Sequence, residues 1–276
     1  IKADSKDREV KLQQFYIKFD YHDYFKLKVG NLKQPFGYEQ DLSRGELLTF
    51  NRSNAHTALS YMGYTARSFA IKGYYNYSKK RPSFPYSYAV SVFRDNSHNI
   101  GLSLKGSRHY NDLVVSSYFQ TQYKTNAKVD SFGGGVDGVY SINNSSLGLG
   151  LYLVEDPVTG FKNADLNSLI TSNSLDLPFL DESIIATTLQ AYLAQRFNAQ
   201  GDVIKAYEPV FLTSIYLPDL NETQDSELQT AFGLNAYFNK GVRLRFQFDL
   251  IFTKKPTSKQ SSINGSSVEL GLQARF

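Results

Sequence analysis

Nine basic side chains are placed where they could form a charged wall. They lie in segments in which apolar and polar residues alternate, and each falls on the polar phase: Lys18, Lys26, Lys28, Lys72, Lys105, Arg196, Arg243, Arg245 and Arg275. The acidic residues on that phase are fewer: Asp20, Asp137, Asp249 and Glu269. An excess of Lys and Arg attracts anions, and a guanidinium also offers a bidentate fork to phosphate or carboxylate oxygens. We therefore predict electrostatic binding of small anions. The alternative for Arg243 and Arg245 is structural pairing with Asp249 or Glu269.

The residue types needed for catalysis or metal binding are scarce. The chain has no cysteine and four histidines, which are His22, His56, His98 and His109. His56 lies near Ser53 and Ser60, but hydroxyls near a loop histidine are common by chance. No two histidines have ligand spacing on a shared strand face. We expect no enzyme activity, no metal and no cofactor, and the dispersed net charge of +4 argues against nucleic acid.

Strict alternation of apolar and polar residues is typical of strands whose two faces meet different environments. Residues 242–252 show it clearly, with Val242, Leu244 and Phe246 on one phase and Arg243 and Arg245 on the other. The same reading predicts about thirteen strands and no clear helix. The strands are expected near residues 9–20, 23–34, 64–76, 86–94, 98–106, 110–123, 130–141, 146–154, 184–196, 203–216, 227–238, 241–253 and 266–276. Pro209 interrupts one of them and suggests a bulge or a covered wall.

The connections between these segments alternate between short turns and long loops, as in outer-membrane β-barrels. The long ones are residues 35–63, 155–183, 217–226 and 254–265. Mean hydropathy is −0.37, and no apolar run approaches the about 20 residues of a membrane helix. A soluble β-sandwich also alternates, but its strands need not be so long or its apolar face so continuous. The pattern therefore favours an all-β fold, a transmembrane antiparallel β-barrel.

One stretch resembles a known family. Residues 24–39 (YFKLKVGNLKQPFGYE), followed by Thr49-Phe50-Asn51-Arg52-Ser53, are similar to the phosphate-selective porin O/P family. Leu32 and Asn51 depart from the family's usual residues, and this leaves phosphate preference open. The resemblance implies a sixteen-stranded, trimeric porin with a basic lumen. The odd strand count also puts residue 8 at the loop end, so we expect residues 1–276 to form a single barrel domain that lacks N-terminal strands.

These observations predict a porin of the bacterial outer membrane that forms a passive, anion-preferring channel for phosphate-like solutes. The expected partners are membrane lipid and lipopolysaccharide, small anions and two further copies of the chain. The alternative is a barrel that serves mainly as a solute-specific uptake site or as a binding platform for another envelope protein. The loop at 35–63 carries Glu39, Asp41 and Glu46 as well as Arg44 and Arg52. Its sequence does not decide whether it folds into the lumen or covers the mouth.

Overall fold

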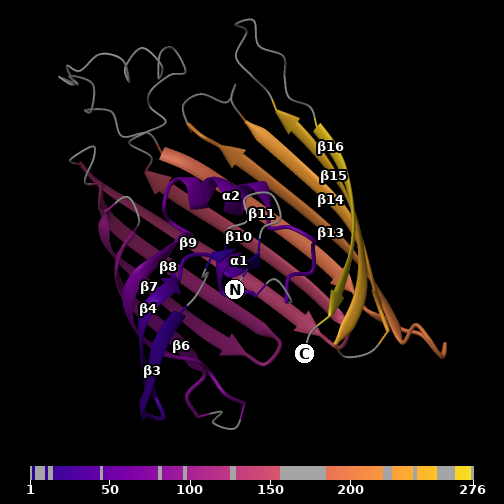
Figure 1. Cartoon of the computed structure of the whole chain (residues 1–276), viewed down its shortest axis with the longest axis horizontal. Helices are drawn as coiled ribbons and strands as arrows, with labels where there is room; N and C mark the ends of the chain where they lie inside the picture. Colours follow the sequence, from indigo (N-terminus) through magenta and orange to yellow (C-terminus); the bar gives the residue numbers. More distant parts are fainter. Residues whose placement is uncertain are drawn as a thin grey trace, which may run out of the picture.

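One large antiparallel sheet dominates the computed structural model (Figure 1). The structure describes residues 2–3, 10–11, 15–43, 46–79, 83–95, 98–124, 129–155, 185–219, 226–238, 241–253 and 265–274. Within these ranges thirteen strands pair in chain order from β3 to β16, and the short β12 pairs beside them with β13. The predicted all-β fold and its thirteen strands are confirmed.

The strands of this sheet, apart from β3 with eight residues and β12 with two, reach the about 9–11 tilted residues that cross a bilayer. They are β3 (Phe15–His22), β4 (Phe25–Lys33), β5 (Arg67–Tyr75), β6 (Tyr86–Arg94), β7 (Ile100–Tyr110), β8 (Leu113–Lys124), β9 (Val129–Ile142), β10 (Ser145–Glu155), β11 (Ile185–Gln195), β12 (Phe197–Asn198), β13 (Ala206–Leu217), β14 (Glu227–Tyr237), β15 (Val242–Thr253) and β16 (Gly265–Ala274). A separate two-stranded pair joins β1 (Lys2–Ala3) to β2 (Val10–Lys11).

The two faces of the sheet differ as the alternation predicts. On β10, Leu149 is 56% exposed, whereas its neighbours Tyr152 and Val154 on the other phase are each 1% exposed. The exposed set on the other strands is also apolar, and includes Phe119, Val136, Leu193, Phe232 and Leu270. A continuous apolar outer face is the surface that a barrel presents to lipid. The structure contains no helix long and apolar enough to span a membrane among the residues it describes.

Most short turns lie at one end of the strands and most long connections at the other. The exceptions include the long connection from Tyr75 to Tyr86 at the turn end and the short one from Arg94 to Ile100 at the loop end. Asn111 and Asn143 take positive φ values of 42° and 51° in tight turns at one end. The connections after Lys33 and Glu155 leave from the other end, as predicted, because six strand reversals separate β4 from β10. Phe276 lies outside the described residues, but Ala274 pairs with Val242 at the turn end.

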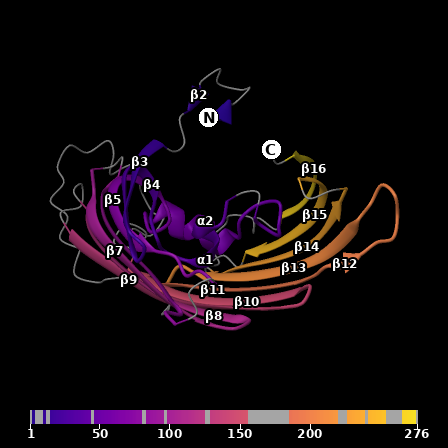
Figure 2. The same cartoon turned by 90° about the horizontal axis from the view of Figure 1, so that it is seen from below.

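The sheet is curved and its first and last strands are not paired with each other in the part of the chain described (Figure 2). Thirteen alternating strands leave β3 and β16 running in the same direction, so the antiparallel ladder cannot continue from one to the other. The predicted absence of direct pairing between residues 9–20 and 266–276 is confirmed for the described part of these segments.

The connection between β4 and β5 contains two helices, which corrects the expectation of none. They are α1 (Tyr38–Asp41) and α2 (Asn54–Tyr61), and both lie on the concave side of the sheet (Figure 2). The Ser53 side chain accepts a hydrogen bond from the His56 backbone N–H and so caps α2. Periodicity missed α2 because eight residues give too few turns for a clear stripe.

The main hydrophobic core lies inside the curve of the sheet, between this connection and the strands. It joins Phe36, Leu59, Met62 and Tyr64 of the connection to strand residues that face inward, which are Tyr118, Tyr152, Val154 and Ala186. The wall of the barrel is therefore covered from within at β8 to β11. A lumen filled only with water would not bury these side chains.

Pro209 sits at a break in a ladder and not in a bulge. On one side β13 pairs with β14 without a register shift. On the other side the pairing with β11 stops at Val210 and the pairing with β12 begins at Tyr207. Pro209 therefore has a paired residue on the β14 side only, as in an edge strand, where proline is tolerated. The predicted covered wall is also present, because Leu212 packs in a buried cluster near Leu48.

Candidate pore and its constriction

The connection of residues 34–66, which we call the inserted loop, crosses the concave side of the sheet to the far strands. The Phe50 N–H donates to the Gln247 side chain on β15. The Asn51 amide donates to both carboxylate oxygens of Glu269 on β16, at 2.7 and 2.8 Å. The Asn54 N–H donates to Gln229 Oε1 on β14 at 2.7 Å. These bonds answer the question that the sequence left open: the loop folds inward and narrows the lumen.

Arg243 and Arg245 hold the backbone of the inserted loop. The Leu47 carbonyl accepts a hydrogen bond from each guanidinium, at 2.8 Å from Arg243 and 3.2 Å from Arg245. Both arginines also donate to Gln273 Oε1 on β16. They are 7% and 6% exposed. Both side chains thus face inward, as predicted, but loop backbone covers them.

The carboxylates proposed as partners of these arginines have other bonds. Asp249 accepts from Gln229 at 3.0 Å and from Gln247 at 2.7 Å. Glu269 accepts from Asn51. The Leu47 carbonyl that both arginines bond to was not among the expected acceptors, because the alternation of a strand shows its own neighbours and not a loop that arrives from elsewhere.

Three of the predicted lysines line a cavity of about 580 Å³ between the inserted loop and β4 to β9. Lys28, Lys72 and Lys105 belong to β4, β5 and β7, and Lys33 at the end of β4 joins them. The ammonium of Lys28 lies between the rings of Tyr16 and Tyr74, at 4.5 and 5.0 Å from their centres. The Lys105 ammonium contacts the Asp41 carboxylate of the loop. Lys33 was not predicted, although it lies on the same strand as Lys28.

Carboxylates face the same cavity from the loop and from the wall. Asp41 and Glu46 come from the inserted loop, and Asp137 comes from β9. Aromatic side chains complete the lining, among them Tyr38, Tyr74, Tyr77 and Tyr88. The cavity is therefore a mixed site, with lysines on the strands, two acids on the inserted loop and a third acid, Asp137, on β9.

The remaining predicted basic residues lie away from this cavity or outside the described residues. Lys18 on β3 is exposed and pairs with Asp20 at 2.7 Å. Lys26 shares a face of β4 with Lys28 but does not line the cavity. The Arg196 guanidinium stacks on the Tyr237 ring at 4.2 Å, just after β11. Arg275 is not in the part of the chain that the structure describes.

A buried polar cluster fixes the two helices of the inserted loop to each other. The Ser53 Oγ donates to the Glu39 carboxylate at 2.8 Å, and the Ser53 N–H donates to the same group. Burial raises the pKa of the Glu39 carboxyl, while the bonds from Ser53 oppose that rise. Burial, with the nearby charges of Arg52 and Lys33, lowers the pKa of His56 to about 3.

This cluster is not arranged as a catalytic triad. His56 Nδ1 lies 4.0 Å from the nearest Glu39 oxygen, which is too far for a hydrogen bond. The Ser53 hydroxyl donates to the carboxylate and accepts from the His56 backbone, so its partner is not the imidazole. No group of acidic, histidine or cysteine side chains among the described residues could hold a metal ion.

The chain resembles several solved outer-membrane proteins. OprB of Pseudomonas putida, in a high-pH structure, matches with a TM-score of 0.63 and 12% identity over 99% of this chain and 74% of that one. An anion-selective porin from Comamonas acidovorans matches with a TM-score of 0.55 and 10% identity, over 91% of this chain and 73% of that one. OmpT, an outer-membrane protein of Vibrio cholerae in its trimer form, matches with a TM-score of 0.56 and 10% identity. The match covers 91% of this chain and 77% of that one.

The chain has the fold of an outer-membrane porin. Its apolar outer face places it in the bacterial outer membrane, where barrels of this kind lie. No family model matches the sequence, and no curated protein matches it either. The resemblance of residues 24–39 to the phosphate-selective porin O/P family stays a prediction, because the structural likeness extends to porins in general.

Proposed function

We propose that the protein is a passive diffusion channel of the bacterial outer membrane that prefers small anions of the phosphate type. The observation that carries the proposal is the cavity beside the inserted loop, with Lys28, Lys33, Lys72 and Lys105 in its lining. The anion-selective porin from Comamonas acidovorans, which shares the fold, supports the same reading. Passage would follow the cavity beside β4 to β9, because the inserted loop packs on β8 to β16 through its core and its hydrogen bonds.

The cavity favours anions through fixed charge. Ammonium groups in a narrow space of low dielectric offset part of the desolvation of an entering anion. Lysine acts here as a point charge, so the wall does not impose the bidentate geometry of an arginine site. Asp41, Glu46 and Asp137 reduce the excess of positive charge. The channel is therefore expected to be anion-preferring and not strictly anion-selective.

A reversal-potential measurement in planar bilayers tests this proposal. Lys72→Gln removes one cavity charge and keeps most of the side-chain volume, so we expect a shift toward cations, larger at low salt because screening is weaker there. Lys205→Gln is the matched control, since Lys205 bonds to Gly201 in an exposed turn. A wild-type channel without anion preference, or equal shifts in both variants, would refute the proposal.

A second function is favoured by one observation. The inserted loop buries large side chains such as Phe36 and Tyr64 within the barrel, and so fills much of its interior. A barrel filled in this way would suit solute-specific uptake or a platform for an envelope protein. Single-channel conductance separates the two readings, because a platform would conduct few ions whereas a diffusion channel conducts steadily.

We also propose that the protein acts as a homotrimer, in view of the trimer form of OmpT. Cross-linking in detergent followed by mass determination tests this. A product three times the mass of the chain is expected, and a monomer under all conditions would contradict it.

A further inference from the structure

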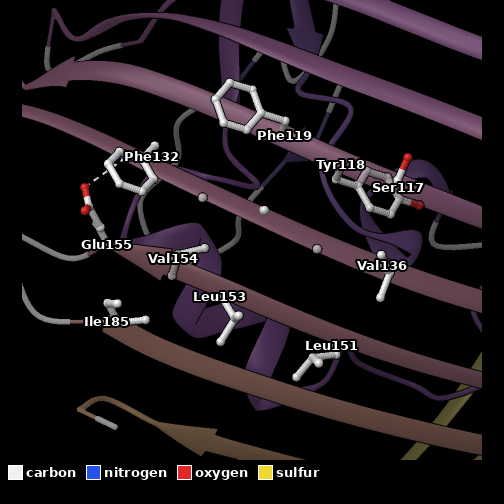
Figure 3. Close-up of a pocket in the computed structure, with 13 residues that line it drawn as sticks. Ser117, Tyr118, Phe119, Phe132, Val136, Leu151, Leu153, Val154, Glu155 and Ile185 are labelled. Atoms are coloured by element: carbon white, nitrogen blue, oxygen red, sulfur yellow. Dashed lines mark hydrogen bonds between the residues drawn. The ribbon is translucent and has the colours of Figure 1, made fainter. Parts of the chain in front are cut away.

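Two hollows lie on opposite faces of the sheet at β8 and β9, and they differ in chemistry. The outer one is lined mainly by apolar side chains, among them Phe119, Leu151 and Leu153 (Figure 3). Its one carboxylate, Glu155, accepts a hydrogen bond from the Phe132 N–H at 3.3 Å. The inner one is the cavity beside the inserted loop. It contains a polar pair that the proposed function has not used so far.

This pair is formed by His109 and Ser87, at the end of the cavity nearest the short turns. His109 is the last residue but one of β7, and Ser87 is the second residue of β6. Both side chains belong to the cavity lining. The Ser87 hydroxyl oxygen lies 2.7 Å from His109 Nε2, which is hydrogen-bond distance. Because short turns are periplasmic in outer-membrane barrels, the pair stands at the periplasmic mouth of the cavity.

Tyr77, in the connection between β5 and β6, contacts both members of the pair. Its backbone N–H donates to Ser87 Oγ at 2.9 Å. Its ring stacks on the imidazole, with 4.5 Å between the ring centres and 28° between the ring planes. The His109 N–H also donates to the Pro85 carbonyl at 2.8 Å. The imidazole is therefore fixed between a hydroxyl and an aromatic face.

The pair can take up a proton and keep its hydrogen bond. In an imidazolium both ring nitrogens carry hydrogen, so His109 Nε2 must then donate to Ser87 Oγ. A serine oxygen has two acceptor positions, and the Tyr77 N–H and the imidazolium fill both of them. The hydrogen of the Ser87 hydroxyl is then available to an acceptor in the cavity. The face of the Tyr77 ring carries partial negative charge and suits an imidazolium.

We propose that protonated His109, together with the Ser87 hydroxyl, forms a contact for small anions at the periplasmic mouth of the cavity that neutral His109 does not provide. Because it concerns the path of anions through the cavity, this proposal rests on the proposed function. The imidazolium supplies a positive charge and the hydroxyl supplies a donor, and both suit the oxygens of a phosphate or a carboxylate. Anion preference should therefore increase as the pH falls through the range in which histidines titrate, between about pH 8 and pH 5.

The other titratable groups of the lining come from most of the elements around the pair. Lys105 lies four residues before His109 on β7, and its ammonium contacts Asp41 of the inserted loop. The remaining charged groups are Lys28 and Lys33 on β4, Lys72 on β5, Asp137 on β9 and Glu46 on the inserted loop. The tyrosines are Tyr38, Tyr74, Tyr77 and Tyr88, whereas β8 adds only Val114 and Ser116. Amines, phenols and carboxylates ordinarily titrate outside this range, and His109 is the one imidazole that the described residues place in the lining.

Reversal potentials of the full chain in planar bilayers, measured under a salt gradient at pH 8 and pH 5, test the proposal. The ratio of anion to cation permeability should rise on acidification roughly twofold more in the wild type than in His109→Gln, because one unit charge acting over about 10 Å of water changes an ion's population by about that factor. His22→Gln is the matched control and should follow the wild type. His22 is an exposed imidazole at the turn end of β3, outside the cavity lining.

His109→Lys supplies the charge without the titration. A lysine keeps its proton throughout this pH range. This variant should therefore show at pH 8 the preference that the wild type reaches at pH 5, and should change less between the two pH values than the wild type does. Channel current shows that a variant has folded and inserted. If His109→Gln gives no channels, the comparison of His109→Lys with the wild type decides alone.

Equal changes with pH in the wild type and in His109→Gln would overturn the proposal, as would a wild-type preference that does not change between the two pH values. Both results leave the proposed function intact when the wild type prefers anions. A wild type that conducts without preferring anions would refute the proposed function, and the difference between the wild type and His109→Gln would still decide the role of His109. A protein that conducts no ions would refute both.

Discussion

The roles of Arg243 and Arg245 depend on the loop backbone that covers their side chains. The alternation of residues on β15 predicts that both side chains point inward. In the structure both guanidinium groups also donate a hydrogen bond to the Leu47 carbonyl. Hydrogen bonds of charged donors contribute about 1.5–3 kcal/mol each. These two residues are therefore expected to fix the inserted loop more than they attract ions in transit.

The double variant Arg243→Gln, Arg245→Gln tests this role. We expect a larger and noisier single-channel current, because the loop loses its anchor on β15. The shift in reversal potential should be smaller than that of Lys72→Gln, although two charges are removed. A large shift toward cations at unchanged conductance would show instead that ions reach these guanidiniums.

His56 makes the packing of the inserted loop sensitive to pH. The packed imidazole binds a proton only near its lowered pKa of about 3, whereas a released loop would bind it near the ordinary value of about 6.5. Between these values the released state holds more protons, so a falling pH favours release. Glu39 acts in the opposite direction, because its raised pKa lets the packed state hold a proton at higher pH.

His56→Gln separates the two effects. From pH 7 to pH 4 the variant's loop should become more stable relative to the wild type, since only the Glu39 contribution remains. The frequency of current fluctuations at each pH measures this difference. Ser60→Ala, at an exposed position of α2, should follow the wild type. An identical pH dependence in all three proteins would contradict the assigned role of His56.

At the scale of elements, the inserted loop supplies the negative side of the cavity. Asp41 at the end of α1 contacts Lys105 on β7, and so offsets one of the lysine charges. We expect Asp41→Asn to increase anion preference, with the reversal potential moving opposite to that of Lys72→Gln. Asp20→Asn is the control, because Asp20 pairs with exposed Lys18 on β3. A shift toward cations in Asp41→Asn would contradict this placement.

The strands could be predicted from the sequence and the inserted loop could not, for a physical reason. In each strand, apolar residues that face lipid alternate with residues that face the interior, so the sequence shows a period of two. Leu149, which is exposed, and Tyr152, which is buried, illustrate this on β10. The position of the loop depends on bonds between distant residues, such as Asn51 with Glu269, which leave no periodic signal. Lys28, Lys72 and Lys105 could therefore be predicted as inward residues, but their grouping at one cavity could not.

At the scale of the whole molecule, the inserted loop divides the interior of the curved sheet into a packed side and a side that contains the cavity. The inserted loop packs on β8 to β16 through its core and its hydrogen bonds, and the cavity remains beside β4 to β9. The chain contains no cysteine, so a single introduced thiol can report which side is open to solutes. Ser87 on β6 lines the cavity and is half-buried, whereas Ser214 on β13 is 2% exposed and bonds to Gln229 beneath the loop.

The most direct test of the account is the block of single-channel current by a charged methanethiosulfonate reagent in Ser87→Cys and Ser214→Cys. The account predicts that the reagent reduces the current through Ser87→Cys and leaves the Ser214→Cys current unchanged. A block of Ser214→Cys together with an unaffected Ser87→Cys would place the path on the other side of the inserted loop, and would contradict the central claim.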